Sequence, residues 1–170
     1  MFVPFDFDGD RILWMEYKEG GSKEFQTYDL SKKQISTINI FDKSYHFLSF
    51  GKLLGDDIIF IENNKNVKLF NLKNNSIMNL YSHSSSIIAF DVADRSSKYY
   101  RLVSVDFNGI FKEWKNGQVQ KTHSLWKTNE LPEQIRKHEL LFDMGYPYYC
   151  KVNGSILAIT TDLGLCIFRI

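Results

Sequence analysis

The sequence predicts an all-β fold built from repeated units of about four short strands. Runs rich in Ile, Val, Phe, Tyr and Thr recur between turn-forming residues along all 170 residues. Helical periodicity is almost absent. The apolar content of 44% and the aromatic content of 15% are typical of a folded domain with a sizeable core.

The expected strands follow one another in four groups, and each group is rich in residues that pack well on a pleated sheet. In chain order they are Ile12–Tyr17, Glu24–Tyr28 and Ile35–Ile40; Ile58–Glu62, Val67–Leu72 and Ile77–Tyr81; Ile87–Val92, Leu102–Val105, Ile110–Trp114 and Val119–Thr122; and Ile156–Thr161 and Leu165–Ile170.

One segment departs from the strand pattern. In "WKTNELPEQIRKHELL", Trp126 to Leu141, Asn129 can cap a helix, Pro132 can stand in its first turn, and Glu133 lies near its start. We therefore expect one short helix inserted between strands, over residues 125–137.

An internal repeat links the four groups. Four windows, "SKEFQTYD", "NKNVKLFN", "NGIFKEWK" and "DLGLCIFR", each open on a turn former and carry an aromatic residue at the seventh place. These aromatics, Tyr28, Phe70, Trp114 and Phe168, are 42, 44 and 54 residues apart, and the inserted helix accounts for the longer third interval. A unit of just over forty residues with about four strands is the pattern of a β-propeller blade.

The unit from Tyr81 to His123 resembles the WD-repeat β-propellers. "SHSSSIIAFDV" resembles the Gly-His and inner strand of that family, "RLVSVDFNG" its second strand and turn, and "GIFKEW" its third strand ending in Trp. Ser82 stands in place of the Gly, and Lys115 follows the Trp in place of Asp. The segment Ile58 to Leu80 repeats the second half of the unit with Phe70 for Trp.

The resemblance implies a buried hydrogen-bonded network that orients the polar corners of the blade. Its members in this chain are His83, Ser104, Asp106 or Asn108, and Trp114. We expect His83 to be structural. A His, a Ser and an Asp in one blade would also fit a nucleophilic triad, but the sequence has no GxSxG elbow.

The architecture that the resemblance implies is a partial WD-repeat-like β-propeller of about four blades. The units are approximately 1–40, 41–80, 81–124 and 138–170, within a single propeller segment 1–170. Because propellers of this family usually close with about seven blades, we expect either part of a longer protein or a partial propeller completed by another chain through open blade edges.

The stretch "DFDGD" offers a competing interpretation. It resembles the DxDG start of the haloacid dehalogenase-type phosphatases, with Asp6 as nucleophile and Asp8 as proton shuttle. However, Asp8-Gly9 occupies the same place in its unit as Asn153-Gly154, and both dipeptides favour tight hairpin turns. The turn signal thus recurs at Asn153-Gly154 without a pair of aspartates, so we interpret "DFDGD" as a turn. Asp56-Asp57 could be the second acidic pair that a phosphatase needs for its metal ion, but we do not favour this interpretation either.

Composition restricts the location and partners. The net charge of +1 gives no global reason to expect nucleic acid or an acidic membrane surface. Cys150 and Cys166 form no metal or disulfide motif. The N-terminus lacks the basic region of a signal peptide, and no window approaches 18 uninterrupted apolar residues. We expect an intracellular protein, cytoplasmic or nuclear.

On these grounds we expect a non-enzymatic scaffold for protein–protein interactions within a multiprotein complex, with no cofactor, no metal ion and no catalytic residue. Its expected partner surface lies around the insertion and comprises Trp126, Arg136, Lys137, Tyr146 and Tyr148. An accessory subunit of an RNA-modifying or RNA-binding complex is the second hypothesis. A phosphatase using Asp6 and Asp8 is the third.

Overall fold

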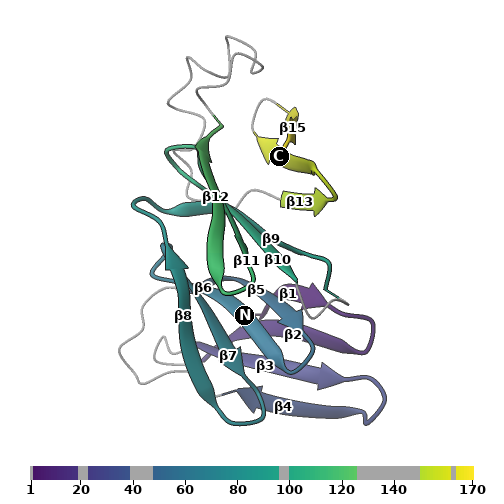
Figure 1. Cartoon of the computed structure of the whole chain (residues 1–170). Coiled ribbons are helices and arrows are strands. Elements are labelled where there is room, and N and C mark those ends of the chain that lie inside the picture. The colour runs from purple at the N-terminus through teal and green to yellow at the C-terminus, as the bar shows by residue number, and fades with distance from the viewer. Residues whose placement is uncertain (1, 19–22, 39–47, 96–99, 126–149, 162–163) are drawn as a thin grey trace. The chain divides into compact units, whose positions relative to one another are not determined.

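The computed structural model describes residues 2–18, 23–38, 48–95, 100–125, 150–161 and 164–170 (Figure 1). Over these ranges the chain forms strands and turns, which confirms the all-β prediction, and no helix is present that could cross a membrane. The predicted helix lies outside the described residues, apart from Leu125.

The strands form four sheets in which chain order is also spatial order, and we call these sheets blades 1 to 4. Pairing is antiparallel, as in the hairpin of β1 and β2.

Blade 1 contains β1 (Phe2–Phe7), β2 (Arg11–Tyr17), β3 (Lys23–Asp29) and β4 (Gln34–Ile38). Blade 2 contains β5 (Leu48–Leu54), β6 (Asp57–Glu62), β7 (Asn66–Asn71) and β8 (Ser76–Ser82). Blade 3 contains β9 (Ile87–Ala93), β10 (Arg101–Asp106), β11 (Ile110–Lys115) and β12 (Gln118–Ser124). Blade 4 contains β13 (Cys150–Asn153), β14 (Ile156–Thr161) and β15 (Gly164–Arg169).

The chain divides into two compact units, Met1–Leu80 and Tyr81–Ile170. The first holds blades 1 and 2, the second holds blades 3 and 4, and the division falls within β8. Each unit has its own hydrophobic core, formed where its two blades pack together.

The core of the first unit is centred on aromatic side chains. Phe25 of blade 1 meets Phe60 of blade 2 edge to face, with ring centroids 6.0 Å apart. Phe5 also packs edge to face on Phe25, with ring centroids 5.6 Å apart. The buried members of this core are Leu13, Met15, Phe25, Ile38, Leu53, Ile58, Phe60 and Phe70. Edge-to-face contact between aromatic rings adds to the stabilisation that burial alone provides.

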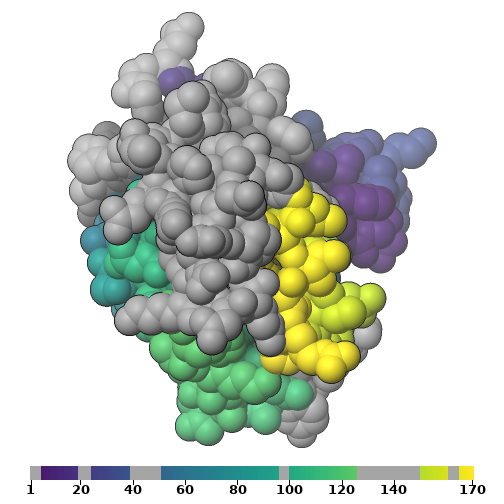
Figure 2. All heavy atoms as spheres, turned by 90° about the horizontal axis from the view of Figure 1, so that it is seen from above, coloured from purple at the N-terminus to yellow at the C-terminus, as the bar shows by residue number. Residues whose placement is uncertain are grey.

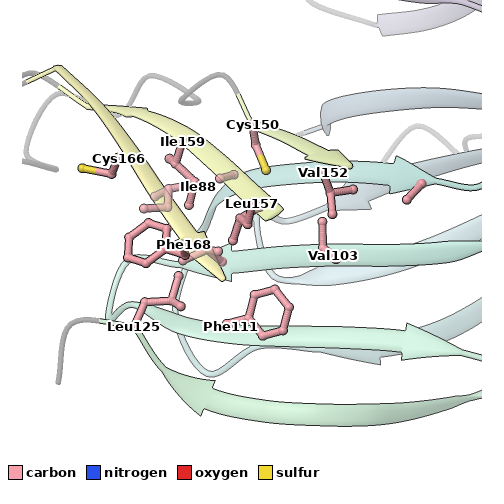
Figure 3. Close-up of a cluster of buried hydrophobic side chains, with 13 residues drawn as sticks. Ile88, Val103, Phe111, Leu125, Cys150, Val152, Leu157, Ile159, Cys166 and Phe168 are labelled. Carbon is pink, nitrogen blue, oxygen red and sulfur yellow. The ribbon is translucent and has the colours of Figure 1, made fainter. Parts of the chain in front are cut away.

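The core of the second unit is mostly aliphatic (Figure 3). Blade 3 contributes Val103 and Phe111, and blade 4 contributes Leu157, Ile159 and Phe168. Both cysteines, Cys150 and Cys166, are buried in this core as free thiols. They therefore pack as small apolar residues.

Three strands are present that the sequence pattern did not predict, namely β1, β5 and β13. Each is the first strand of its blade and lies at the edge of its sheet. β1 contains Pro4 and β5 contains Gly51, and each has a register shift next to that residue. β13 has only four residues. Proline and glycine are tolerated at such edges and bulges, although they weaken the strand signal in the sequence.

Gly51 lies where blade 2 approaches blade 1 closely. A Cβ atom at this position would come within 2.9 Å of Leu13 Cδ2 and 3.3 Å of Phe5 Cδ2. We therefore expect Gly51→Ala to lower the free energy of unfolding by about 1–3 kcal/mol through overpacking. The check is urea unfolding of Gly51→Ala, of Leu13→Val, and of the double variant.

The double variant is the control in this experiment. Leu13→Val removes the carbon atom nearest to the new methyl group, so the double variant should be less destabilised than the sum of the two single variants. Additive losses would contradict the steric explanation.

Candidate functional site

Blade 3 contains a buried polar network centred on His83. The His83 side chain and those of Ser104 and Asp106 are fully buried or nearly so. His83 Nε2 lies 2.7 Å from Ser104 Oγ, and Nδ1 lies 3.2 Å from Asp106 Oδ2. Ser104 and Asp106 are two residues apart on β10, so both side chains point to the same face of the sheet.

Asp106 also organises the turn that follows β10. Its Oδ1 atom accepts hydrogen bonds from the backbone N–H of Asn108 at 3.0 Å and from that of Ile110 at 2.9 Å. One carboxylate thus connects the end of β10, the turn and the start of β11 to the histidine.

Two pKa values in the network are displaced. Burial raises the pKa of Asp106, but hydrogen bonds from His83 and from the backbone of Ile110 and Asn108 outweigh burial and hold this pKa below its usual value. Burial raises the pKa of Tyr81, and the hydrogen bond to Ser104 offsets only part of that rise. Asp106 is therefore a carboxylate and Tyr81 a neutral phenol at physiological pH.

Tyr81 is a member that sequence reasoning missed. Its hydroxyl lies 2.9 Å from Ser104 Oγ, and its ring lies 6.0 Å from that of His83. Tyr81 stands on β8, two residues before His83, and only the folded blade brings it to β10. The spacing "YSH" was the available signal, but alone it does not distinguish a network member from a core residue.

The network has the connectivity of a Ser-His-Asp triad. Ser104 Oγ, however, is fully buried and also contacts the Tyr81 hydroxyl. In this conformation the serine cannot reach a substrate. The arrangement therefore acts as a structural clamp that satisfies buried polar groups.

The other two predicted network members, Trp114 and Asn108, have different contacts. Trp114 is buried, pairs with Leu102 in the β10–β11 register, and stacks on Tyr100 with ring centroids 5.5 Å apart. Asn108 takes part through its backbone N–H. Of the two residues proposed for the turn position, Asp106 supplies the side chain and Asn108 the main chain.

The acidic residues of "DFDGD" have separate structural contacts. Asp8 Oδ1 accepts hydrogen bonds from the backbone N–H of Asp10 at 3.1 Å and of Arg11 at 2.7 Å, and Oδ2 forms an ion pair with Arg11 at 2.7 Å. Burial raises the pKa of Asp8, but the contacts with Arg11 and Asp10 lower it by more than burial raises it. The pKa of Asp8 is therefore below its usual value. Gly9 has a φ of +102°, as a tight turn requires. Asp6 Oδ2 accepts a hydrogen bond from the backbone N–H of Leu53 at 2.8 Å.

Asp56 and Asp57 are likewise engaged by neighbouring side chains. Asp56 forms an ion pair with Lys73 at 2.6 Å, and Asp57 accepts a hydrogen bond from the Asn71 amide at 2.6 Å. Within the described ranges, no group of three or more His, Cys, Asp and Glu side chains is placed to hold a metal ion.

A second set of polar contacts joins neighbouring blades and recurs in both units. In the first unit, Asp6 accepts the Leu53 N–H and lies 3.9 Å from Lys52. In the second unit, Asp91 Oδ2 accepts the Val152 N–H at 3.0 Å and lies 3.6 Å from Lys151. An acidic side chain on the first strand of one blade thus holds the first strand of the next blade.

An arginine makes a further contact between the same blades. Arg11, the first residue of β2, donates a hydrogen bond to the carbonyl of Gly55, and Arg101, the first residue of β10, donates one to the carbonyl of Gly154. Both glycines lie in the first hairpin of the following blade. The sequence signals were "PFDF" and "AFDV" for the acids and "GKLLG" and "CKVNG" for the lysines, and sequence reasoning overlooked them.

The predicted partner surface lies outside the described residues. Trp126, Arg136, Lys137, Tyr146 and Tyr148 all fall within 126–149, so this surface remains a prediction.

Comparison with known proteins gives structural neighbours but no relative in sequence. No protein-family model matches the chain, and no curated protein is similar to it in sequence. The computationally designed Ika4 protein matches 96% of the chain over 88% of its own length, with a TM-score of 0.60 and 14% identity.

Two larger natural structures also match. The N-terminal domain of Nup159 matches 97% of the chain with a TM-score of 0.57 and 16% identity, and BamB from Moraxella catarrhalis matches 99% with a TM-score of 0.54 and 11% identity. The chain spans 44% of each of these two structures. Together with the four sheets, these similarities support a β-propeller fold.

Proposed function

We propose that the chain is a non-enzymatic, WD-repeat-like β-propeller that acts as a scaffold for protein partners within a multiprotein complex. The observation that carries this proposal is how the candidate catalytic side chains are used. His83, Ser104 and Asp106 are buried in a clamp, whereas Asp6 and Asp8 hold a blade contact and a turn. These residues stabilise blades, and rigid blades present surfaces.

Exposed apolar side chains on regular strands support this role. Ile35 on β4 is 58% exposed, and Ile77 and Met78 on β8 are about half exposed. Methionine and branched aliphatic residues on a rigid surface are suited to protein contacts. One structure similar to the chain is of Saccharomyces cerevisiae Nup159 bound to Dbp5 and Gle1, with a TM-score of 0.53 and 17% identity. That protein therefore binds protein partners, which agrees with the role proposed here.

The proposal includes a location inside the cell. Both cysteines are buried and free, so no disulfide bond joins the described residues. This pattern fits a reducing compartment.

Purification of the tagged chain from its native source tests the scaffold. We expect one or more proteins to co-purify in stoichiometric amount and to stay bound after RNase treatment. Asp8→Asn should retain the same proteins and should not change magnesium-dependent phosphate release from p-nitrophenyl phosphate, because the contacts of Asp8 are with its own turn and with Arg11.

The controls separate the three hypotheses. Release of the co-purifying proteins by RNase would favour the RNA-complex hypothesis. Phosphate release that Asp8→Asn abolishes would favour the phosphatase. Absence of any stoichiometric protein would contradict the scaffold.

A further inference from the structure

The fourth strand of blades 1, 2 and 3 lies at the edge of its sheet. Among the described residues, these strands, β4, β8 and β12, are each hydrogen-bonded to the third strand of their own blade alone. Most of their side chains are exposed. An edge strand presents a row of backbone N–H and C=O groups with which another strand can pair.

β8 is the edge strand with the least protection against such pairing (Figure 1). It has seven residues, and none of them is charged, proline or glycine. Ile77 and Met78 are 47% and 52% exposed and, as neighbours along a strand, point to opposite faces of the sheet. Natural edge strands are usually protected by charged side chains, proline or bulges. Lys121 gives β12 this protection, and the green strand β12 lies at the surface in Figure 2.

The order of side-chain types along β8 is the same from either end. Its residues are, in chain order, Ser76, Ile77, Met78, Asn79, Leu80, Tyr81 and Ser82. Asn79 is the centre, with two apolar or aromatic residues and then one serine on each side. If two such strands pair antiparallel about a twofold axis at Asn79, every polar residue faces a polar one. Every apolar residue likewise faces an apolar or aromatic one.

We propose that β8 pairs with β8 of a second copy of this chain, antiparallel and with Asn79 opposite Asn79. The sheet of blade 2 then continues across the twofold axis into the same sheet of the second copy. Ile77 lies opposite Tyr81 on one face, and Met78 lies opposite Leu80 on the other. Pairs of this kind across neighbouring strands stabilise a sheet. The inference goes beyond the scaffold proposal and does not depend on it.

The other two edge strands show why the symmetry of β8 selects a second copy. In β12, the same arrangement places Lys121 opposite Lys121, and like charges directly opposite one another destabilise a sheet. In β4, it places Gln34 opposite Ile38 and Ile35 opposite Thr37, so polar residues face apolar ones. An identical strand fits β8 because it supplies the matching order of side chains.

Sedimentation velocity of the full chain tests the proposal. We expect a dimer of twice the 19.9 kDa chain mass. Asn79→Lys and Asn79→Asp should each raise the dimer Kd on the order of 10-fold or more, because each places two like charges opposite one another. Ser36→Lys is the matched control, since Ser36 is the exposed central residue of β4, and it should leave the dimer unchanged. Circular dichroism should show the same strand content for every variant.

Mixing the two charged variants tests the register. An equimolar mixture of Asn79→Lys and Asn79→Asp should recover the dimer, because Lys then faces Asp on the axis. A monomeric wild-type chain at tens of micromolar would overturn the proposal. So would a dimer that both variants leave intact, or a mixture that associates no better than either variant alone.

Cross-linking gives a second measurement of the same register. Residues opposite one another have Cα atoms about 4.5–5.5 Å apart, within the range of a disulfide bond. Asn79→Cys should therefore form a covalent dimer under mild oxidation, and the two native cysteines are buried. Met78→Cys is the control, because its thiols lie on the diagonal, at about 7–8 Å between Cα atoms, and should cross-link poorly. Equal cross-linking of the two variants would contradict pairing at Asn79.

Discussion

Replacing Asp106 with alanine is expected to lower the free energy of unfolding by about 3–5 kcal/mol. The substitution removes the acceptor for three hydrogen bonds, from His83, Asn108 and Ile110, inside a fully buried site. Each stranded donor then bears its desolvation cost without compensation. Urea unfolding followed by circular dichroism measures the loss.

The matched control is Asp10→Ala, since Asp10 is an exposed aspartate in a turn. It should change the unfolding free energy by no more than about 0.5 kcal/mol. Asp106→Asn should fall between the two, because its amide oxygen can still accept hydrogen bonds from the turn. Equal losses in Asp106→Ala and Asp10→Ala would contradict the clamp.

The lowered pKa of Asp106 predicts that the free energy of unfolding depends on pH. The folded pKa of Asp106 is below the value of 3.8 expected for the unfolded chain. Its stabilising contribution is therefore complete above about pH 5 and is lost as the pH falls through 3.8 towards the folded pKa. Asp106→Asn should lose less stability than the wild type between pH 5 and pH 3. It should keep part of the slope, because the pKa values of Asp8, Asp29 and Asp56 are also lowered.

Replacing Asp91 with alanine is expected to cost about 3 kcal/mol. Asp91 is fully buried, accepts the Val152 N–H, and lies 3.6 Å from Lys151, so it joins blades 3 and 4. The loss should appear first as faster hydrogen exchange in β13 and β14, because these strands belong to the smaller blade that Asp91 holds. Exchange mass spectrometry on the variant measures it.

The equivalent residue in the other unit provides the comparison. Asp6→Ala should increase exchange in β5 and leave β13 unchanged, since each aspartate serves its own unit. If Asp91→Ala accelerated exchange in β5 as much as in β13, the local role of this contact would be wrong.

The sequence predicted the second and third strands of every blade well. These strands, such as β6 and β10, are short runs of branched residues bounded by turns, and their pattern is local. The network of His83, Ser104 and Asp106 could be found only through the family resemblance, because His83 is 21 residues or more from the other two and meets them only in the folded chain.

The first strands were harder for a physical reason. β1, β5 and β13 pair on one side only, so a proline, a glycine or a length of four residues is tolerated there. The contacts of Asp6 and Asp91 cross from one blade to the next over 47 and 61 residues. No local pattern reveals such distances, although the recurrence of an acid in one blade and a lysine in the next could have been noticed.

The alternation of Asp6, Lys52, Asp91 and Lys151 along the chain has a consequence for stability. Acid and base alternate with every blade, so the repeating element of these contacts is a pair of blades, although the repeating element of the backbone is one. Each of the units Met1–Leu80 and Tyr81–Ile170 therefore carries one complete acid–lysine contact, and a change in one unit leaves the contact of the other unit in place.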